Sequence, residues 1–285
     1  MNPKFGASIL SYMLPKWNDA DGITTIQKTA AAGFDLIEIL LPPSLDIDTS
    51  KTLNALRKNN IDIVCSMNLP PFAHIPFHPK EAISLLTKTL DVTEALGSQL
   101  LCGVLHSGIG VFSGDILQET EKNTIVEAWQ EVADYAKTKG IDIAVEPINR
   151  YESYVCNTAK NVSDLIAKTG KDNIYLHLDT FHMNIEESNF SEPILSYGQQ
   201  LKHIHMTESD RGMLGEGNVH WDDLFAALQK INYTGNLVLE NFSSSIKGMQ
   251  QAVSLWQKSP YNAEDLAYGS LRFMKQMVEK YNTKC

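Results

Sequence analysis

Four short apolar segments in the second half of the chain each end in a residue that can bind a metal ion. The segments are Ile141–Glu146, Asn173–Asp179, Leu201–His205 and Asn236–Glu240. Their last residues are separated by 33, 26 and 35 positions, about the length of one strand, one helix and the connecting loops. Side chains that recur at this interval lie at the same end of successive parallel strands. We therefore predict that Glu146, Asp179, His205 and Glu240 form one divalent-metal site.

The rest of the chain alternates in the same way between apolar strand patterns and helical patterns. Further strands are predicted at Phe5–Leu10, Leu36–Leu40, Asp62–Met67 and Gln99–Val104. The predicted helices are Gly22–Ala32, Thr49–Asn59, Pro79–Leu96, Glu119–Lys139, Ala159–Thr169, Glu192–Gln199, Trp221–Ile231 and Glu264–Tyr281. Gly33, Gly97 and Gly140 follow three of them as stop signals. The pattern predicts eight strands and eight helices in alternation.

This alternation indicates an α/β protein with a parallel sheet, and two architectures fit it. A doubly wound open sheet normally carries a glycine-rich phosphate turn after its first strand, whereas Ser8–Met13 has no such turn. The length of 285 residues is close to the roughly 250 typical of a (β/α)8 barrel. We predict a single TIM-barrel domain over residues 1–285, with the active site at the carboxyl ends of the strands. Long loops are expected there at Thr180–Ser191, Thr207–His220 and Asn241–Asn262.

Charge and hydropathy exclude several functional classes. The formal charge of −10 argues against general nucleic-acid binding, which needs a cationic surface. No apolar run reaches the length of about 18 residues expected of a membrane span, and the first residues do not resemble a signal peptide. We expect a cytoplasmic protein. The four cysteines, at positions 65, 102, 156 and 285, form no metal-binding pair and are interpreted as buried or incidental thiols.

The four predicted ligands suit a catalytic cation. A mainly oxygen-donor set with one imidazole favours Mn²⁺ or Mg²⁺, with Co²⁺ also accommodated. If each glutamate binds through one oxygen, the other oxygen remains available to move a proton. Glu146 and Glu240 come from the first and last of the four strands, so they can face each other across a substrate. Such a pair suits removal of a proton next to a carbonyl and its return on the opposite face.

The residues two positions before the ligands point the same way along the strands and are predicted to form a layer beneath the metal. His177 and His203 belong to this layer. A histidine in a barrel layer is more often a core residue, although either one could orient a metal ligand.

Three motifs resemble the ketose 3-epimerases, the tagatose and allulose (psicose) 3-epimerases of the xylose-isomerase-like barrel superfamily. They are Glu146–Glu152, Leu178–Glu187 and His203–Ser209, and they occur in the order found in that family. The resemblance implies metal binding by the four predicted ligands and acid–base catalysis by Glu146 and Glu240. It also implies that Glu152, His182 and Arg211 hold the O1 to O3 end of the sugar.

The implied reaction is inversion of C3 of a ketose of the tagatose, allulose/fructose or ribulose type, through a metal-bound cis-enediolate. Two positions depart from the family pattern and leave the sugar open. His106–Gly110 lacks the aromatic pair of the family's His-Ser-Tyr-Trp sequence, and Asn241 replaces the proline of Glu-Pro-Phe. A phosphorylated or larger sugar is therefore an alternative substrate.

Other functions remain possible from the sequence. The same barrel and metal could serve an aldose–ketose isomerase, or a dehydratase or epimerase acting on keto-sugars. An apurinic endonuclease would need a histidine-rich multi-metal cluster and a basic groove, and a sugar-binding protein would not need the acid–base carboxylates. The family resemblance further implies a homodimer or homotetramer that acts on a small-molecule sugar, without nucleic-acid or membrane partners.

Overall fold

The computed structural model describes residues 1–283, in which eight parallel strands close into a barrel. The strands are β1 (Lys4–Ser8), β2 (Leu36–Leu40), β3 (Asp62–Ser66), β4 (Leu100–Gly103), β5 (Asp142–Val145), β6 (Ile174–Asp179), β7 (Leu201–Met206) and β8 (Asn236–Leu239). Each strand pairs with the next, and β8 pairs with β1, so the sheet has no free edge. The predicted barrel is confirmed, and the open doubly wound sheet is excluded.

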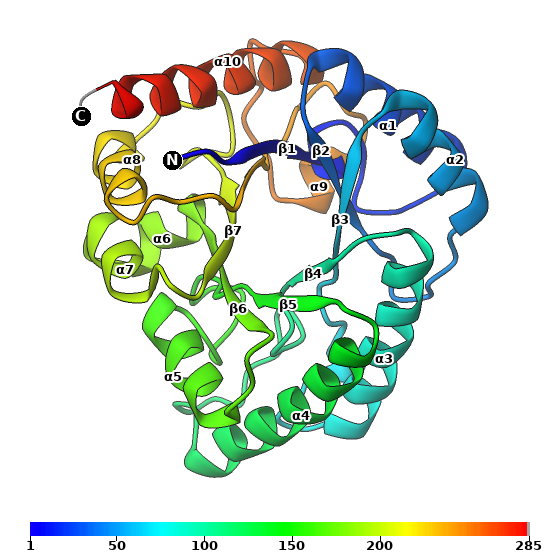
Figure 1. Cartoon of the computed structure of the whole chain (residues 1–285), viewed down its shortest axis with the longest axis vertical. Coiled ribbons are helices and arrows are strands. Elements are labelled where there is room, and N and C mark those ends of the chain that lie inside the picture. Colours follow the sequence, from blue (N-terminus) through cyan, green and yellow to red (C-terminus); the bar gives the residue numbers. More distant parts are fainter. Residues whose placement is uncertain (284–285) are drawn as a thin grey trace.

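A ring of helices surrounds the strands (Figure 1). The helices are α1 (Asp19–Ala32), α2 (Thr49–Asn59), α3 (Pro79–Ala95), α4 (Glu119–Thr138), α5 (Ala159–Thr169), α6 (Thr180–Glu186), α7 (Ser191–Tyr197), α8 (Trp221–Lys230), α9 (Met249–Ala252) and α10 (Ala263–Asn282). Two 3₁₀ turns lie at Ile9–Ser11 and Pro71–Ala73. All eight predicted helices are present, with ends that differ by three residues or fewer.

Local sequence explains where several helices begin and end. The Thr158 hydroxyl accepts a hydrogen bond from the Asn161 amide at the start of α5. Gly33, Gly97 and Gly140 follow α1, α3 and α4 with φ of 90°, 79° and 66°, a conformation that a side chain makes costly. The predicted stop signals are confirmed.

The core has two parts, because the strands are buried on both faces. One apolar cluster lies inside the barrel and consists of Leu36, Val64, Leu100, Cys102, Ala144 and Val238. A much larger cluster lies between the strands and the helices. Cys65, Cys102 and Cys156 are buried free thiols, as predicted, and Cys285 lies outside the described residues.

The segment that differs most from the prediction follows β6. Thr180–Ser191 was expected to be a long loop, but its first seven residues form α6. The Asp179 carboxylate accepts a hydrogen bond from the Phe181 amide at 2.6 Å, so the last residue of the strand also caps a helix. Asn241–Asn262 similarly contains the single turn of α9, whereas Thr207–His220 contains no helix.

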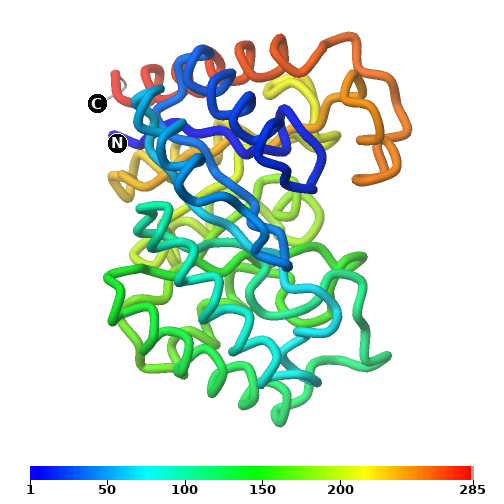
Figure 2. Tube along the Cα trace, turned by 90° about the vertical axis from the view of Figure 1, so that its right-hand side faces the viewer, coloured from blue at the N-terminus to red at the C-terminus, as the bar shows by residue number. Residues whose placement is uncertain are grey.

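The two ends of the barrel differ in construction. Figure 2 shows the N-terminus at one end and the segment around residue 250, in orange, projecting at the other. The long segments after β6, β7 and β8 therefore gather at the carboxyl ends of the strands, where the active site was predicted. None of the helices within residues 1–283 combines the length and the apolar character needed to cross a bilayer.

Candidate active site

The four predicted metal ligands meet at the carboxyl ends of β5 to β8. His205 Nδ1 lies 3.7 Å from Glu146 Oε1, 3.8 Å from Asp179 Oδ2 and 3.6 Å from Glu240 Oε1. Asp179 ends β6, His205 lies one residue before the end of β7, and the two glutamates directly follow β5 and β8. The structure thus brings together three carboxylates and one imidazole nitrogen, from residues spread over almost 100 positions of the chain.

The polar atoms at this point fit a bound cation. Asp179 Oδ2 and His205 Nδ1 are buried and have no hydrogen-bond partner, which is costly unless another group satisfies them. Burial, together with the neighbouring carboxylates, raises the pKa of Glu146 well above its ordinary value. Burial is also the main cause that raises the pKa of Asp179 to about 6. Crowded, desolvated carboxylates of this kind gain most from a divalent ion.

A fourth carboxylate, that of Glu38 on β2, lies beside these residues and was not predicted. Its Oε2 atom lies 2.8 Å from His205 Nε2 and 2.8 Å from His203 Nε2. Although burial alone would raise the pKa of Glu38, the two histidines outweigh it and hold the pKa well below its ordinary value. An ionised carboxylate only accepts hydrogen bonds, so both Nε2 atoms carry the proton. His205 Nδ1 is then left as the nitrogen that faces the three carboxylates.

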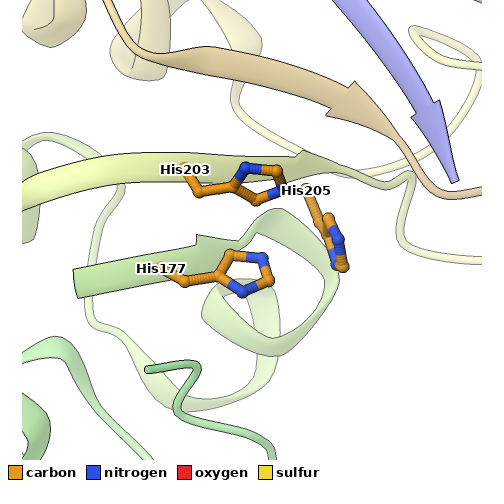
Figure 3. Close-up of side chains that lie close together, drawn as sticks. All are labelled: His177, His203 and His205. Carbon is orange, nitrogen blue, oxygen red and sulfur yellow. The ribbon is translucent and has the colours of Figure 1, made fainter. Parts of the chain in front are cut away.

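Three histidine rings lie in contact beneath the carboxylates. Figure 3 shows His203 and His205 on one strand and His177 on its neighbour. The His177 ring meets the His205 ring edge to face, with centroids 4.2 Å apart, and neither of its nitrogens has a hydrogen-bond partner. Burial lowers the pKa of His177 well below its ordinary value, so this ring is neutral. Of the two histidines predicted for this layer, only His203 shares a hydrogen-bond acceptor with the His205 ligand.

The three predicted substrate-binding residues line one cavity of about 650 Å³ together with Glu146, His205 and Glu240. The Asn149 backbone amide donates to His182 Nδ1 at 3.1 Å, so His182 carries its proton on Nε2, which lies 3.8 Å from Glu146 Oε1. Asn149 Nδ2 also donates to Glu152 Oε1 at 3.0 Å. One asparagine therefore fixes two of the residues that face the cavity.

Arg211 is fixed from three sides. Its guanidinium carbon lies 4.1 Å from the centre of the Phe181 ring and 4.6 Å from that of the Phe242 ring. Arg211 Nη1 donates to Glu240 Oε2 at 2.5 Å. The backbone has φ of 58°, an uncommon value for a residue with a side chain. These contacts fix the positions of the Arg211 guanidinium and of Glu240 Oε2.

Glu208 organises the segment that carries Arg211, a role the sequence did not reveal. Its side chain is fully buried, and its two oxygens accept four hydrogen bonds. Ser209 N and Val219 N donate to Oε1 at 2.8 and 3.1 Å, and Gly215 N and Trp221 Nε1 donate to Oε2, both at 2.9 Å. Gly217 allows this fold, because a Cβ atom there would lie 2.5 Å from Glu208 Oε1.

The outer part of the cavity is apolar. Its lining includes Leu10, Pro15, Ile109, Val253 and Leu255. Arg211 is the one lysine or arginine among the described residues that line the cavity, and it is already paired with Glu240. The position where the family's aromatic pair is missing is therefore bordered by aliphatic side chains. No lysine or arginine among the described lining residues lies there to bind a phosphate.

Comparison with known proteins places the chain among sugar epimerases. Residues 26–277 match the family model described as xylose isomerase-like TIM barrel. The chain is 36% identical over 266 residues to the L-ribulose 3-epimerase of Methylomonas sp. (strain DH-1), covering 91% of this chain and 93% of the relative. It is 34% identical over 274 residues to the ketose 3-epimerase of Arthrobacter globiformis, covering 93% and 94%. A crystal structure of the D-allulose 3-epimerase from Methylomonas sp. in complex with D-allulose aligns over 97% of both chains, with a TM-score of 0.90 and 35% identity.

Proposed function

The chain belongs to the ketose 3-epimerases of the xylose isomerase-like TIM barrel family, and on this premise we propose that it inverts C3 of a free ketose. The proposed substrates are of the ribulose, allulose/fructose or tagatose type. The observation that carries the proposal is the convergence of Glu146, Asp179 and Glu240 around His205 Nδ1 beside a cavity of about 650 Å³. Similar relatives act on ribulose and on allulose, as their names state.

In the proposed mechanism two carboxylates work on opposite faces of C3. One removes the C3 proton and the other delivers a proton to the opposite face, through an enediolate. Glu146 and Glu240 follow strands that are three positions apart in the barrel, and both line the cavity. The raised pKa of Glu146 suits a group that must hold a proton for part of the cycle.

The remaining residues hold the reacting end of the sugar. His182 Nε2–H, Arg211 and Glu152 supply donors and acceptors for the O1 to O3 atoms. Glu146, Asp179, His205 and Glu240 would hold a divalent cation, for which Mn²⁺ is proposed ahead of Mg²⁺ or Co²⁺. When bound, such a cation withdraws charge from the substrate's carbonyl and hydroxyl oxygens. All four side chains are buried, so they are largely shielded from bulk water.

The apolar outer cavity supports an unphosphorylated substrate. A phosphate is normally held by several cationic or charge-assisted donors, whereas Arg211, at the reacting end, is the one lysine or arginine among the described lining residues. The distal carbons of the sugar would contact Ile109 and the segment 252–255. This favours a free ketose over the phosphorylated alternative.

The test is deuterium incorporation. Ribulose, allulose, fructose and tagatose are incubated in deuterated buffer with protein and Mg²⁺, and the products are followed by proton NMR. We expect the C3 epimer to form with deuterium at C3. Exchange at C1 would instead indicate an aldose–ketose isomerase, loss of water would indicate a dehydratase, and unchanged spectra for all four sugars and their phosphates would contradict the proposal.

A matched pair of variants tests the two-face mechanism. Glu146→Gln and Glu240→Gln each leave one carboxylate, so each variant should exchange the C3 proton of one epimer and not of the other. Epimerisation should fall by about 10²- to 10⁴-fold in both. Metal content is measured in parallel, because both residues are proposed ligands. Exchange into both epimers by either variant would contradict the assignment.

A further inference from the structure

Glu38 lies beside the proposed metal ligands but is not one of them. It is the one acidic residue in the otherwise apolar strand β2 and is only 2% exposed. Burying a carboxylate is costly unless it is hydrogen-bonded, and Glu38 Oε2 accepts hydrogen bonds from His203 and His205 on β7. In the closed barrel, β8 and β1 separate β7 from β2 along one side, so these bonds cross the barrel interior.

We propose that Glu38 is a positioning residue of the metal centre, which holds His205 so that Nδ1 faces Glu146, Asp179 and Glu240. This inference rests on the proposed function, because it assumes that the four side chains bind a cation. Rotating the His205 ring by half a turn would place carbon atoms where Nδ1 and Nε2 now lie. Such a rotation would lose both the Glu38 bond and the nitrogen that faces the carboxylates, so the bond selects one ring orientation.

The charge of Glu38 also matters for this role. Glu38 Oε2 accepts from both imidazoles at 2.8 Å, and the carboxylate charge strengthens both bonds. A glutamine oxygen in this place could accept from both histidines, but as a neutral group it would form weaker bonds. His203 donates the second hydrogen bond and so holds the Glu38 carboxylate beside β7, next to His205. A hydrogen-bond partner of this kind makes a histidine a better metal ligand.

Metal affinity tests the proposal directly. Metal-stripped wild type, Glu38→Gln and Glu38→Ala are titrated with Mn²⁺ by calorimetry, and thermal unfolding in EDTA checks that each variant is folded. Loss of such a partner typically weakens metal binding 10- to 100-fold, and we expect this for Glu38→Ala, with a smaller loss for Glu38→Gln, which keeps an acceptor oxygen but not its charge. The control is Cys102→Ala, because Cys102 Sγ lies 3.7 Å from the same oxygen and its removal leaves both imidazole bonds in place. This control should bind Mn²⁺ within about twofold of wild type.

The outcomes separate the two claims. If wild type binds no divalent ion, the proposed metal-dependent function fails. If wild type binds Mn²⁺ and folded Glu38→Ala binds it equally well, the role of Glu38 is structural and the inference is overturned.

A measurement on wild type covers the case in which the variants do not fold. Long-range ¹H–¹⁵N correlation spectra of the Mg²⁺-loaded protein report which nitrogen of His205 is protonated. We expect a proton on Nε2 and none on Nδ1. A proton on Nδ1 would overturn the proposal without any substitution.

Discussion

Replacing Glu208 by glutamine should loosen the segment that carries Arg211. The carboxylate has two oxygens with two donors each, so the substitution turns one oxygen into an NH₂ group that faces two N–H groups. Whichever oxygen is replaced, two hydrogen bonds are lost. A neutral amide also remains in a place surrounded by three backbone N–H donors and the Trp221 indole N–H.

The size of the effect follows from these contacts. A hydrogen bond to a charged group contributes about 1.5–3 kcal/mol, so the loss of two corresponds to roughly 3–6 kcal/mol. This is a large part of the roughly 5–15 kcal/mol that stabilises an ordinary domain. Because the donors Ser209, Gly215 and Val219 lie in one segment, we expect much of the loss as local opening of residues 207–220.

Three measurements check this prediction against a matched control, Glu216→Gln. Glu216 lies in the same segment, and its carboxylate accepts a bond from the exposed Tyr261 hydroxyl. Glu208→Gln should lower the free energy of unfolding in urea by about 3 kcal/mol or more and speed amide exchange at Gly215 and Val219 roughly 100-fold. KM should rise, because the segment positions Arg211. The control should change the free energy of unfolding by less than about 0.5 kcal/mol.

A Glu208→Gln protein with the wild-type free energy of unfolding and wild-type amide exchange at Gly215 and Val219 would contradict this prediction. Equal effects of Glu208→Gln and Glu216→Gln would also contradict the prediction. They would show that losing either carboxylate charge in residues 207–220 destabilises the protein to the same extent. A rise in KM without faster exchange would separate substrate binding from the order of the segment.

Three further predictions concern the site itself. Arg211→Lys keeps the charge but loses the stacking between Phe181 and Phe242, so kcat/KM should fall about 10- to 100-fold in steady-state assays; an unchanged value would show that the rings do not orient the cation. Burial raises the pKa of Asp179 to about 6, so the Mn²⁺ affinity measured by calorimetry should weaken as pH falls below about 6, by up to tenfold per unit. The stability of the metal-free protein should decrease as pH rises through the same value. A flat affinity profile from pH 5 to 8 would contradict this prediction. Ile109→Ser removes apolar surface at the outer cavity. The ratio of kcat/KM for a 6-deoxyketohexose to kcat/KM for the parent ketohexose should therefore fall about fourfold, which corresponds to about 0.8 kcal/mol per methyl-sized group. No change in this ratio would place the sugar tail elsewhere.

Sequence reasoning succeeded where the information is local. Each proposed ligand lies at the end of its own apolar strand, and regular spacing places those ends on one side of a parallel barrel. The fold and the meeting of Glu146, Asp179, His205 and Glu240 follow from this periodicity. The helix at Thr180–Glu186 was missed because it is short and is capped by Asp179, whose side chain was interpreted only as a metal ligand.

The contacts that were missed depend on closure of the whole barrel. Glu38 and His205 are 167 positions apart, and only the return of β8 to β1 brings them within 2.8 Å. A single acidic residue inside Leu-Ile-Glu-Ile-Leu was the available signal, because a carboxylate buried on a central strand needs a partner. Glu208 gave no such signal, since three of the four donors around it come from a loop whose path has no periodic pattern.

The origin of the cavity walls bears on how such an enzyme can change its substrate. The reacting end is built by residues at the ends of β5 to β8 and by the segments that follow β5, β6 and β7, whereas the apolar outer wall comes from segments after β1, β4 and β8. Grafting residues 109–112 and 250–258 from another barrel of this kind would give the enzyme a different outer wall, while His106, which bonds the Glu146 carbonyl, and the side chains that move the proton would be inherited unchanged.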